Sequence, residues 1–546
     1  MTQETAPLPS RPDVLLILAD DMGFSDIGCY GGEIDTPVLD ALGRAGTRFT
    51  RFSNSPRCSP TRASLLTGLH PHQVGIGILT GDERPDGYPG DLSEACHTAA
   101  ELLGAAGYGT FLSGKWHLSA SMDEPTSSWP LERGFDRVFG TIEGAGSYFA
   151  PVGLRRDGVD AMAETAPEDF YYTDAIGEAT RGHIADHLRE RPQDPMFLYV
   201  PFTAPHWPLH ARPADVERCR GRYDEGWDVI RARREQRLVA EGIIGPEVRP
   251  GPRDPAVPAW TEVADPAWQA RRMEVYAAQI EAMDRAIGRI VSALEDAGRL
   301  ENTLVLFLSD NGACEEEMPP GGDPAFRTLP MVPDRTRDGR AIELGNEPGI
   351  EPGGEGSFAS YGREWADVSN TPFREYKHWV HEGGISTPLI VHWPAGLGRP
   401  GDLCRTPAQL VDVLPTLLEV AGAGYPTRRR GCEVPAAEGS SLLPLLRGGG
   451  PAAGRGPLFW EHEGNGAISS GRWKLVRKHA RPWELYDMER DRCELEDLAD
   501  EHPDLVAALA AAYEQWAHRV GVIPRDRILE ARRRREVEGP EAPRLP

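Results

Sequence analysis

The sequence predicts an α/β protein: a large domain with a mostly parallel central sheet flanked by helices, then a small C-terminal domain with an antiparallel sheet and a helix. Three observations support this fold. Short apolar segments alternate with helical patterns over most of the chain. The 546 residues exceed what one hydrophobic core usually holds. The stretch "RGGGPAAGRG" at 447–456 has the composition of a linker or exposed loop. We therefore place the two domains at residues 1–446 and 447–546.

Four apolar segments predict the strands of the large domain. "DVLLILADD" at 13–21 reads as a buried strand that runs into a loop, because its apolar residues are continuous and end at two aspartates. "MFLYVPF" at 196–202, "TLVLFLSDNG" at 303–312 and "TPLIVHWP" at 387–394 have the same character. Continuous rather than alternating apolar residues are typical of strands covered on both faces.

Local start signals predict the helices between these strands. "TPVLDALGRAG" has Thr36 as its N-cap and Pro37 in its first turn. "TAAELLGAAG" begins with the capping box of Thr98 and Glu101. Apolar residues spaced three or four apart predict a long helix over 273–298.

The C-terminal segment predicts a smaller unit of different composition. "PLFWEHE" at 457–463, "AISSGRWKLVRK" at 467–478 and "WELYDM" at 483–488 are strand candidates. A helix follows at 503–520, and the tail from residue 531 is expected to be frayed.

Composition argues against several classes of function. The formal net charge of −25 disfavours non-specific binding to nucleic acid or anionic membranes. The apolar run at 14–19 is too short to span a bilayer, and the N-terminal sequence lacks the features of a signal peptide. We expect a soluble, cytoplasmic protein that binds neither nucleic acid nor membranes. The eight cysteines form no Cys-x-x-Cys pair, so most are expected to be ordinary thiols.

Oxygen-bearing side chains follow two of the predicted strands. Asp20 and Asp21 come directly after the first strand, and Asp310 and Asn311 end the strand segment at 303–312. In open α/β sheets the carboxyl ends of strands are where sites are built, and adjacent carboxylates repel unless a cation lies between them. Three carboxylates and an amide oxygen suit Ca²⁺ or Mg²⁺ rather than zinc. Each pair alone reads as turn chemistry, but the two together favour a metal site.

Basic and nucleophilic side chains form a second group. Lys115 and His117 stand two apart, so both can point to one side of an extended segment. His206 follows a predicted strand, and Lys377 lies in "NTPFREYKHWVHEGG". Each alone is more often structural or solvated, but several at segment ends could hold an anion beside a metal. Cys58, just before a predicted helix, could be a buried thiol, a metal ligand or a nucleophile.

Seven motifs in a fixed order add a resemblance that covers about residues 12 to 520. They are "ILADDMGFSDIGCYGG", "CSPTRASLLTG", "GKWH", "PFTAPHWP", "SDNGA", "NTPFREYKHWVHEGGISTPLIVHWP" and "LVDVLPTLLEVAG". With them the sequence resembles the type I sulfatases of the alkaline-phosphatase-like superfamily and looks closest to the bacterial arylsulfatases. One short motif would be weak, but seven in order are strong. The resemblance implies hydrolysis of sulfate esters, with aryl sulfates giving a phenol and inorganic sulfate.

The resemblance also implies roles for individual residues. In the family, a maturation enzyme oxidises the cysteine of Cys-x-Pro-x-Arg to Cα-formylglycine, so Cys58 is expected to be modified. Pro60 and Arg62 belong to the sequence signal that the maturation enzyme reads. Arg62 is also expected to lie in the active site, beside the formylglycine and the metal. His117 is implied as the base and His206 as the general acid. The other implied positions are Lys115 and Lys377 for sulfate oxygens, and Asp20, Asp21, Asp310, Asn311 and the modified Cys58 for a divalent cation, usually Ca²⁺, with Mg²⁺ left open.

Two other functions stay open at this point. Related enzymes use the same nucleophile on phosphoryl centres, so a phosphonate monoester or phosphodiester hydrolase is the alternative enzyme. A metal-binding protein whose Cys58 remains a thiol is the alternative from another class. The leaving-group pocket is also open: Tyr148 and Phe149 in "EGAGSYFAP" could stack on an aryl group or belong to the core.

Overall fold

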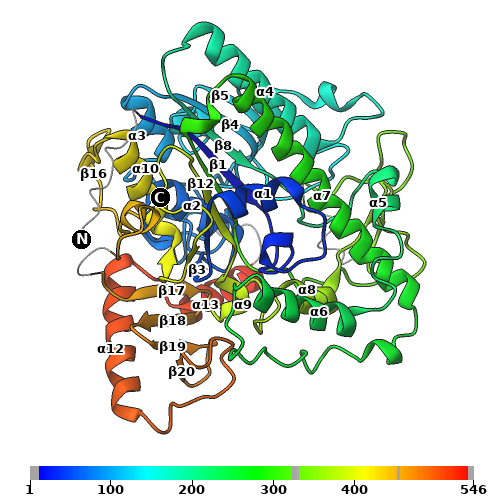
Figure 1. Ribbon diagram of the computed structural model, residues 1–546, viewed down its shortest axis with the longest axis vertical. Helices are drawn as coiled ribbons and strands as arrows, with labels where there is room; N and C mark the ends of the chain where they lie inside the picture. The colour runs from blue at the N-terminus through cyan, green and yellow to red at the C-terminus, as the bar shows by residue number, and fades with distance from the viewer. Residues whose placement is uncertain (1–10, 322–328, 330, 452–454, 539–546) are drawn as a thin grey trace.

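A ten-stranded sheet runs through the larger part of the molecule in this computed structural model, which describes residues 11–321, 329, 331–451 and 455–538 (Figure 1). Its central strands are parallel, and antiparallel strands extend both edges. The predicted, mostly parallel sheet is therefore confirmed. In spatial order the strands are β13 (Leu403–Cys404), β2 (Thr47–Phe49), β12 (Leu389–His392), β9 (Thr303–Ser309), β1 (Asp13–Ala19), β8 (Met196–Pro201), β4 (Gly109–Lys115), β5 (Arg137–Thr141), β6 (Leu154–Arg156) and β7 (Val159–Asp160).

The strand order brings distant segments to one edge of the sheet. β1 lies between β9 and β8, with Ala19 beside Ser309 and Leu18 beside Pro201. β4 is parallel to β8 on its other side. Because parallel strands end at the same edge, the residues that follow all four strands emerge together. This edge is where the candidate site is built.

Helices cover both faces of the sheet, and β1 shows how they pack. Leu15 and Ile17 belong to the core shared with α1, α4 and α7, whereas Leu16 and Leu18 belong to the core shared with α2, α3 and α10. This alternation follows the two-residue period of a strand and explains its continuous apolar sequence. Figure 1 shows α4 beside α7. The bounds are α1 (Pro37–Ala45), α2 (Cys58–Thr67), α3 (Ala99–Ala105), α4 (Tyr172–Glu190), α7 (Pro266–Asp296) and α10 (Val413–Ala421).

The predicted helix starts are confirmed, although the side chain of Thr36, the N-cap residue of α1, makes no capping hydrogen bond. α1 begins at Pro37. At α3 the Thr98 hydroxyl accepts the Glu101 N–H at 3.2 Å, and the Glu101 carboxylate accepts the Thr98 N–H at 2.9 Å. The long helix predicted over 273–298 is α7, which already begins at Pro266. The prediction started too late because the first two turns of the helix lack the apolar period on which it was based.

The C-terminal part holds a four-stranded antiparallel sheet packed against α12 (Pro503–Val520), as predicted (Figure 1). The buried Lys474 of this sheet places its Nζ 2.8 Å from carboxylates of Glu382 and Glu494, which ties it to α9 (Glu382–Ile385) of the larger part. The boundary at residues 446 and 447 stays a prediction. The strands are β17 (Leu458–His462), β18 (Asn465–Ser470), β19 (Trp473–Arg477) and β20 (Glu484–Asp487).

The expectation of a frayed tail from residue 531 is wrong over its described part. α13 (Arg525–Glu538) continues the chain as a helix. Its Arg532 places Nε 2.9 Å from a carboxylate oxygen of Glu83, a partner far away in sequence, so local composition gave no signal of this contact. Residues 539–546 lie outside the described part. None of the described helices combines the length and apolar character needed to cross a lipid bilayer.

Candidate active site

Two parallel strands deliver the oxygen-bearing residues to one place. The Asp310 N–H donates to the Ala19 carbonyl at 3.0 Å, which continues the pairing of β9 with β1 past the last strand residues. In the loop just after β1, the Asp21 N–H donates to Asp310 Oδ1 at 3.1 Å. The Asn311 amide donates to Asp21 Oδ1 at 2.8 Å. The four residues predicted from two separate strand ends are thus one buried cluster.

α2 brings Cys58 and Arg62 to this cluster. The helix begins at Cys58, so the thiol lies at its N-terminus, and Arg62 follows one turn later on the same side. The fully buried Arg62 donates through Nη2 to Asp310 Oδ2 at 2.8 Å and lies 3.6 Å from Asp20 Oδ2. Cys58 Sγ lies 3.5 Å from His117 Nδ1. The Cys-x-Pro-x-Arg motif therefore places a thiol and an arginine that contacts two of the aspartates on one side of the helix.

The end of β4 supplies Lys115 and His117. Lys115 Nζ donates to Asp20 Oδ2 at 2.6 Å. His117 has φ +54°, an uncommon value for a residue with a side chain, and this turn aims its ring at Cys58. Burial, followed by the nearby cations Lys115 and Arg62, lowers the pKa of His117 well below its ordinary value. The ring is therefore neutral and able to accept a proton.

His206 and Lys377 converge on one carboxylate oxygen. Asp21 Oδ2 lies 3.3 Å from His206 Nε2 and accepts a hydrogen bond from Lys377 Nζ at 2.8 Å. His206 Nδ1 lies 2.6 Å from the Trp207 carbonyl. Burial lowers the pKa of His206 to about 3, although Asp21 favours the charged ring. Burial alone would lower the pKa of Lys377, but the neighbouring Asp21 carboxylate holds it well above its ordinary value, so the ammonium stays charged.

The acidic cluster fits a hard divalent cation. Asp20 Oδ1 and Asn311 Oδ1 are both buried without a hydrogen-bond partner among the described residues. Both amide protons of Asn311 are already used, on Asp21 Oδ1 and the Gly312 carbonyl, which leaves its oxygen as the free atom. Burial, followed by repulsion from Asp20, raises the pKa of Asp310 to about 7. A cation bound by these oxygens would satisfy them and remove the repulsion.

The structure decides between the two alternatives left open for Tyr148 and Phe149, in favour of the core. Tyr148 is 1% exposed, and its hydroxyl donates to the carbonyls of Thr203 and His206 at 2.9 and 2.8 Å. Its ring packs on Tyr171, as does that of the buried Phe149. Both aromatics are core residues, and the hydroxyl of Tyr148 supports the turn that carries His206.

The structure also reveals neighbours of the site that the sequence did not indicate. Arg57 Nη1 lies 2.8 Å from Glu316 Oε1, and the Trp207 indole N–H donates to Glu316 Oε2 at 2.9 Å. Glu316 is one of three consecutive glutamates, and nothing in "CEEEMPP" shows which of them faces the site. For Trp207 the sequence did offer a clue, because this residue directly follows the predicted site residue His206 in the "PHWP" motif.

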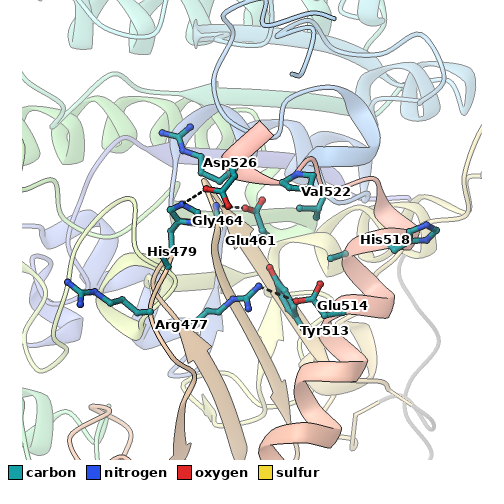
Figure 2. A pocket seen from close by; sticks show the side chains of 14 residues that line it. Glu461, Gly464, Arg477, His479, Tyr513, Glu514, His518, Val522 and Asp526 are labelled. Carbon is teal, nitrogen blue, oxygen red and sulfur yellow. Dashed lines mark hydrogen bonds and ion pairs between the residues drawn. The ribbon is translucent and has the colours of Figure 1, made fainter. Parts of the chain in front are cut away.

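A cavity of about 460 Å³ lies in the C-terminal part, between its sheet and α12 (Figure 2). Charged side chains line it, and several are already paired: Arg477 with Glu514 at 3.1 Å and His479 with Asp526 at 3.3 Å. None of the residues predicted for the site borders this cavity. It is therefore separate from the chemistry described above.

The fold and the site place a thiol at a helix N-terminus beside buried carboxylates, lysines and histidines, an arrangement typical of a hydrolase active site. Residues 12–423 match the Sulfatase family, and residues 374–517 match the C-terminal region of N-sulphoglucosamine sulphohydrolase. The chain belongs to the sulfatase family, the enzymes that hydrolyse sulfate esters.

Similar proteins agree with this assignment. An uncharacterized sulfatase of Schizosaccharomyces pombe is 34% identical, over 95% of this chain and 96% of its own. The arylsulfatase of Klebsiella aerogenes is 35% identical, over 76% of this chain and 87% of its own. The crystal structure of Ps i-CgsB superposes with a TM-score of 0.68 at 22% identity, covering 97% of this chain and 98% of that one. The phosphonate monoester hydrolase of Agrobacterium radiobacter shares the fold too, with a TM-score of 0.56 at 21% identity, over 93% of this chain and 96% of that one.

Proposed function

We propose that this sulfatase hydrolyses aryl sulfates with a Cα-formylglycine hydrate made from Cys58 by a maturation enzyme. The observation that carries the proposal is the contact between Cys58 and His117 at 3.5 Å, directly beside the Arg62–Asp310 pair. In this arrangement Cys58 Sγ stands where an oxygen of the hydrate would lie. The nucleophile, its base and the metal-binding carboxylates then share one buried site.

Two steps complete the reaction. In the first, one hydroxyl of the hydrate ionises and its proton passes to water. The resulting oxyanion attacks sulfur, the bond between sulfur and the ester oxygen breaks, and the departing oxygen takes a proton from the protonated ring of His206. In the second, His117 removes the proton of the other hydroxyl, the carbon–oxygen bond to sulfate breaks, and the aldehyde is restored. Water then adds to the aldehyde and regenerates the hydrate. A serine in this place would lack the second hydroxyl and would remain sulfated.

The charged residues have separate parts in this scheme. Lys115 and Lys377 hold the sulfate oxygens and offset the negative charge that develops on them. Ca²⁺ would be held by the side-chain oxygens of Asp20, Asp21, Asp310 and Asn311. After modification of Cys58, an oxygen of its hydrate would join them. The bound cation would supply positive charge that favours ionisation of the attacking hydroxyl. Ca²⁺ rather than Mg²⁺ and a cytoplasmic location stay predictions.

The sulfate and phosphoryl alternatives are separated by one comparison. We expect nitrophenyl sulfate to be turned over at least about tenfold more efficiently, in kcat/KM, than nitrophenyl esters of a phosphonate or a phosphodiester. The same sample is digested for mass spectrometry of the Cys58 peptide. An aldehyde at Cys58 with the opposite preference would make the enzyme a phosphoryl hydrolase instead.

A general acid at His206 predicts a dependence on the leaving group. In His206→Ala, kcat/KM is expected to fall about 100-fold for sulfates of weakly acidic phenols, but less than about tenfold for nitrophenyl sulfate, whose phenolate leaves without a proton. In the wild type the sulfate of the ester adds negative charge beside His206 and favours its protonated ring. The check is the slope of log kcat/KM against phenol pKa. His518→Ala, an exposed histidine of α12, is the control. An equal loss for all esters would assign His206 to substrate binding rather than proton transfer.

A further inference from the structure

Three side chains outside the assigned machinery link its two ends. Arg57 is the residue before Cys58 and precedes the first turn of α2. Trp207 is the residue after His206, and the two rings lie 4.5 Å apart. Glu316 joins them, since one carboxylate oxygen lies 2.8 Å from Arg57 Nη1 and the other accepts the Trp207 indole N–H at 2.9 Å. We call Arg57, Glu316 and Trp207 the bridge.

The position of the bridge follows from the reaction. Cys58 supplies the attacking atom and His206 protonates the departing oxygen, so the breaking sulfur–oxygen bond lies between them. The bridge contains the residue before Cys58 and the ring that packs on His206, so it lies beside both residues. The charges agree with this position: burial raises the pKa of Glu316, but Lys377 and Arg57 outweigh it and hold that pKa well below its ordinary value. The Glu316 carboxylate is therefore close enough to feel the sulfate-binding lysine.

The bridge is accessible as well as ordered. Side chains of Arg57 and Glu316 are 20% and 35% exposed, and Trp207 is half-buried. The indole is held by the Glu316 hydrogen bond, by the His206 ring and by a small apolar cluster that includes Phe358 of β11 (Ser357–Phe358) at 6.1 Å. The other buried members of the cluster are Val332, Ile342 and Leu344. A fixed, partly exposed aromatic ring loses little entropy when another ring packs on it.

We propose that Trp207 is the stacking surface for an aromatic leaving group, and that Glu316 and Arg57 are positioning residues that hold the indole in place. This inference rests on the proposed function and deepens it to a preference for aryl over alkyl sulfates. Tyr148 and Phe149 do not compete for the role, because both are buried in the core.

The test compares two sulfate esters of equal leaving ability. Phenyl sulfate is paired with a fluorinated alkyl sulfate whose alcohol matches phenol in acidity, so that the ratio of their kcat/KM values reports stacking rather than bond cleavage. In Trp207→Leu the aryl-to-alkyl ratio is expected to fall about tenfold. In Trp207→Phe, which keeps an aromatic face, it stays within about threefold. In Glu316→Leu, which frees the indole, it falls by about threefold.

Controls separate this inference from simpler explanations. Trp483→Leu removes a half-buried tryptophan of the C-terminal part and is expected to leave the ratio unchanged. Thermal melting of each variant checks that it folds. An equal loss for both esters in Trp207→Leu, or an unchanged ratio, overturns the inference while leaving the proposed function intact. A wild-type enzyme with aldehyde at Cys58 that cleaves neither sulfate overturns the proposed function itself.

Discussion

Replacement of Cys58 by alanine is expected to abolish turnover, lowering kcat by at least about 10⁴-fold, because the proposed reaction depends on the hydrate made from this residue. Cys58→Ser is expected to behave differently. Its single hydroxyl can attack sulfur but cannot be released by the second step, so the serine keeps the sulfo group. The measurement is steady-state turnover of nitrophenyl sulfate combined with mass spectrometry of the peptide that carries residue 58.

Cys404→Ala is the matched control, since Cys404 is a half-buried cysteine of β13 outside the site. It is expected to retain wild-type turnover. The wild-type peptide is expected to show the aldehyde at residue 58. A Cys58→Ala variant that keeps activity would falsify the role of this residue, and an unmodified but active wild type would show that the thiol itself suffices.

Removal of the divalent cation is expected to produce the second large effect. Chelation should lower turnover about 10²- to 10³-fold, because the carboxylates of Asp20 and Asp310 then repel each other and the attacking hydroxyl loses its electrostatic support. Added Ca²⁺ should restore activity and raise the melting temperature, since a ligand that binds only the folded state stabilises it. Asp310→Asn should show neither response.

Asp526→Asn provides the control for this experiment, because Asp526 is an exposed carboxylate beside the C-terminal cavity and should not alter the response to Ca²⁺. The melting temperature gives a readout independent of catalysis. If Mg²⁺ and Ca²⁺ restore turnover equally, the site does not discriminate between them, and the ion bound would depend on which is available. A melting temperature that ignores both ions in the wild type would contradict a cation site at this cluster.

The residues of the site were predictable, but their contacts were not. The aspartates after β1 and β9 stand out because charged residues directly follow apolar strands. Lys115 pairs with Asp20 across the intervening strand β8, and His206 pairs with Asp21 from the turn that follows β8, the strand next to β1. Such pairings depend on strand order, which local sequence patterns do not encode.

Errors and omissions fall where tertiary contacts override local patterns. Tyr148 is of a residue type that often stacks on aromatic ligands, yet its hydroxyl donates to two backbone carbonyls and its ring lies in the core. The tail at 531–538 lacks an apolar face, yet α13 forms where its arginines meet an acidic loop. Glu316 was missed because its neighbours Glu315 and Glu317 are chemically identical and only the fold selects one of them.

The sequence by itself determined the class of fold, the positions of the long helices and strands, and the residue types at the site, because apolar periodicity, capping signals and ordered motifs are local properties. Tertiary structure alone decided which of those residues meet. The order β9–β1–β8–β4 places four strand ends at one edge, and the burial of that edge makes charges pair that would be solvated on an open chain. The same burial leaves Asp20 and Asn311 with oxygens that accept no hydrogen bond from the described residues, which is the physical reason for proposing a cation there.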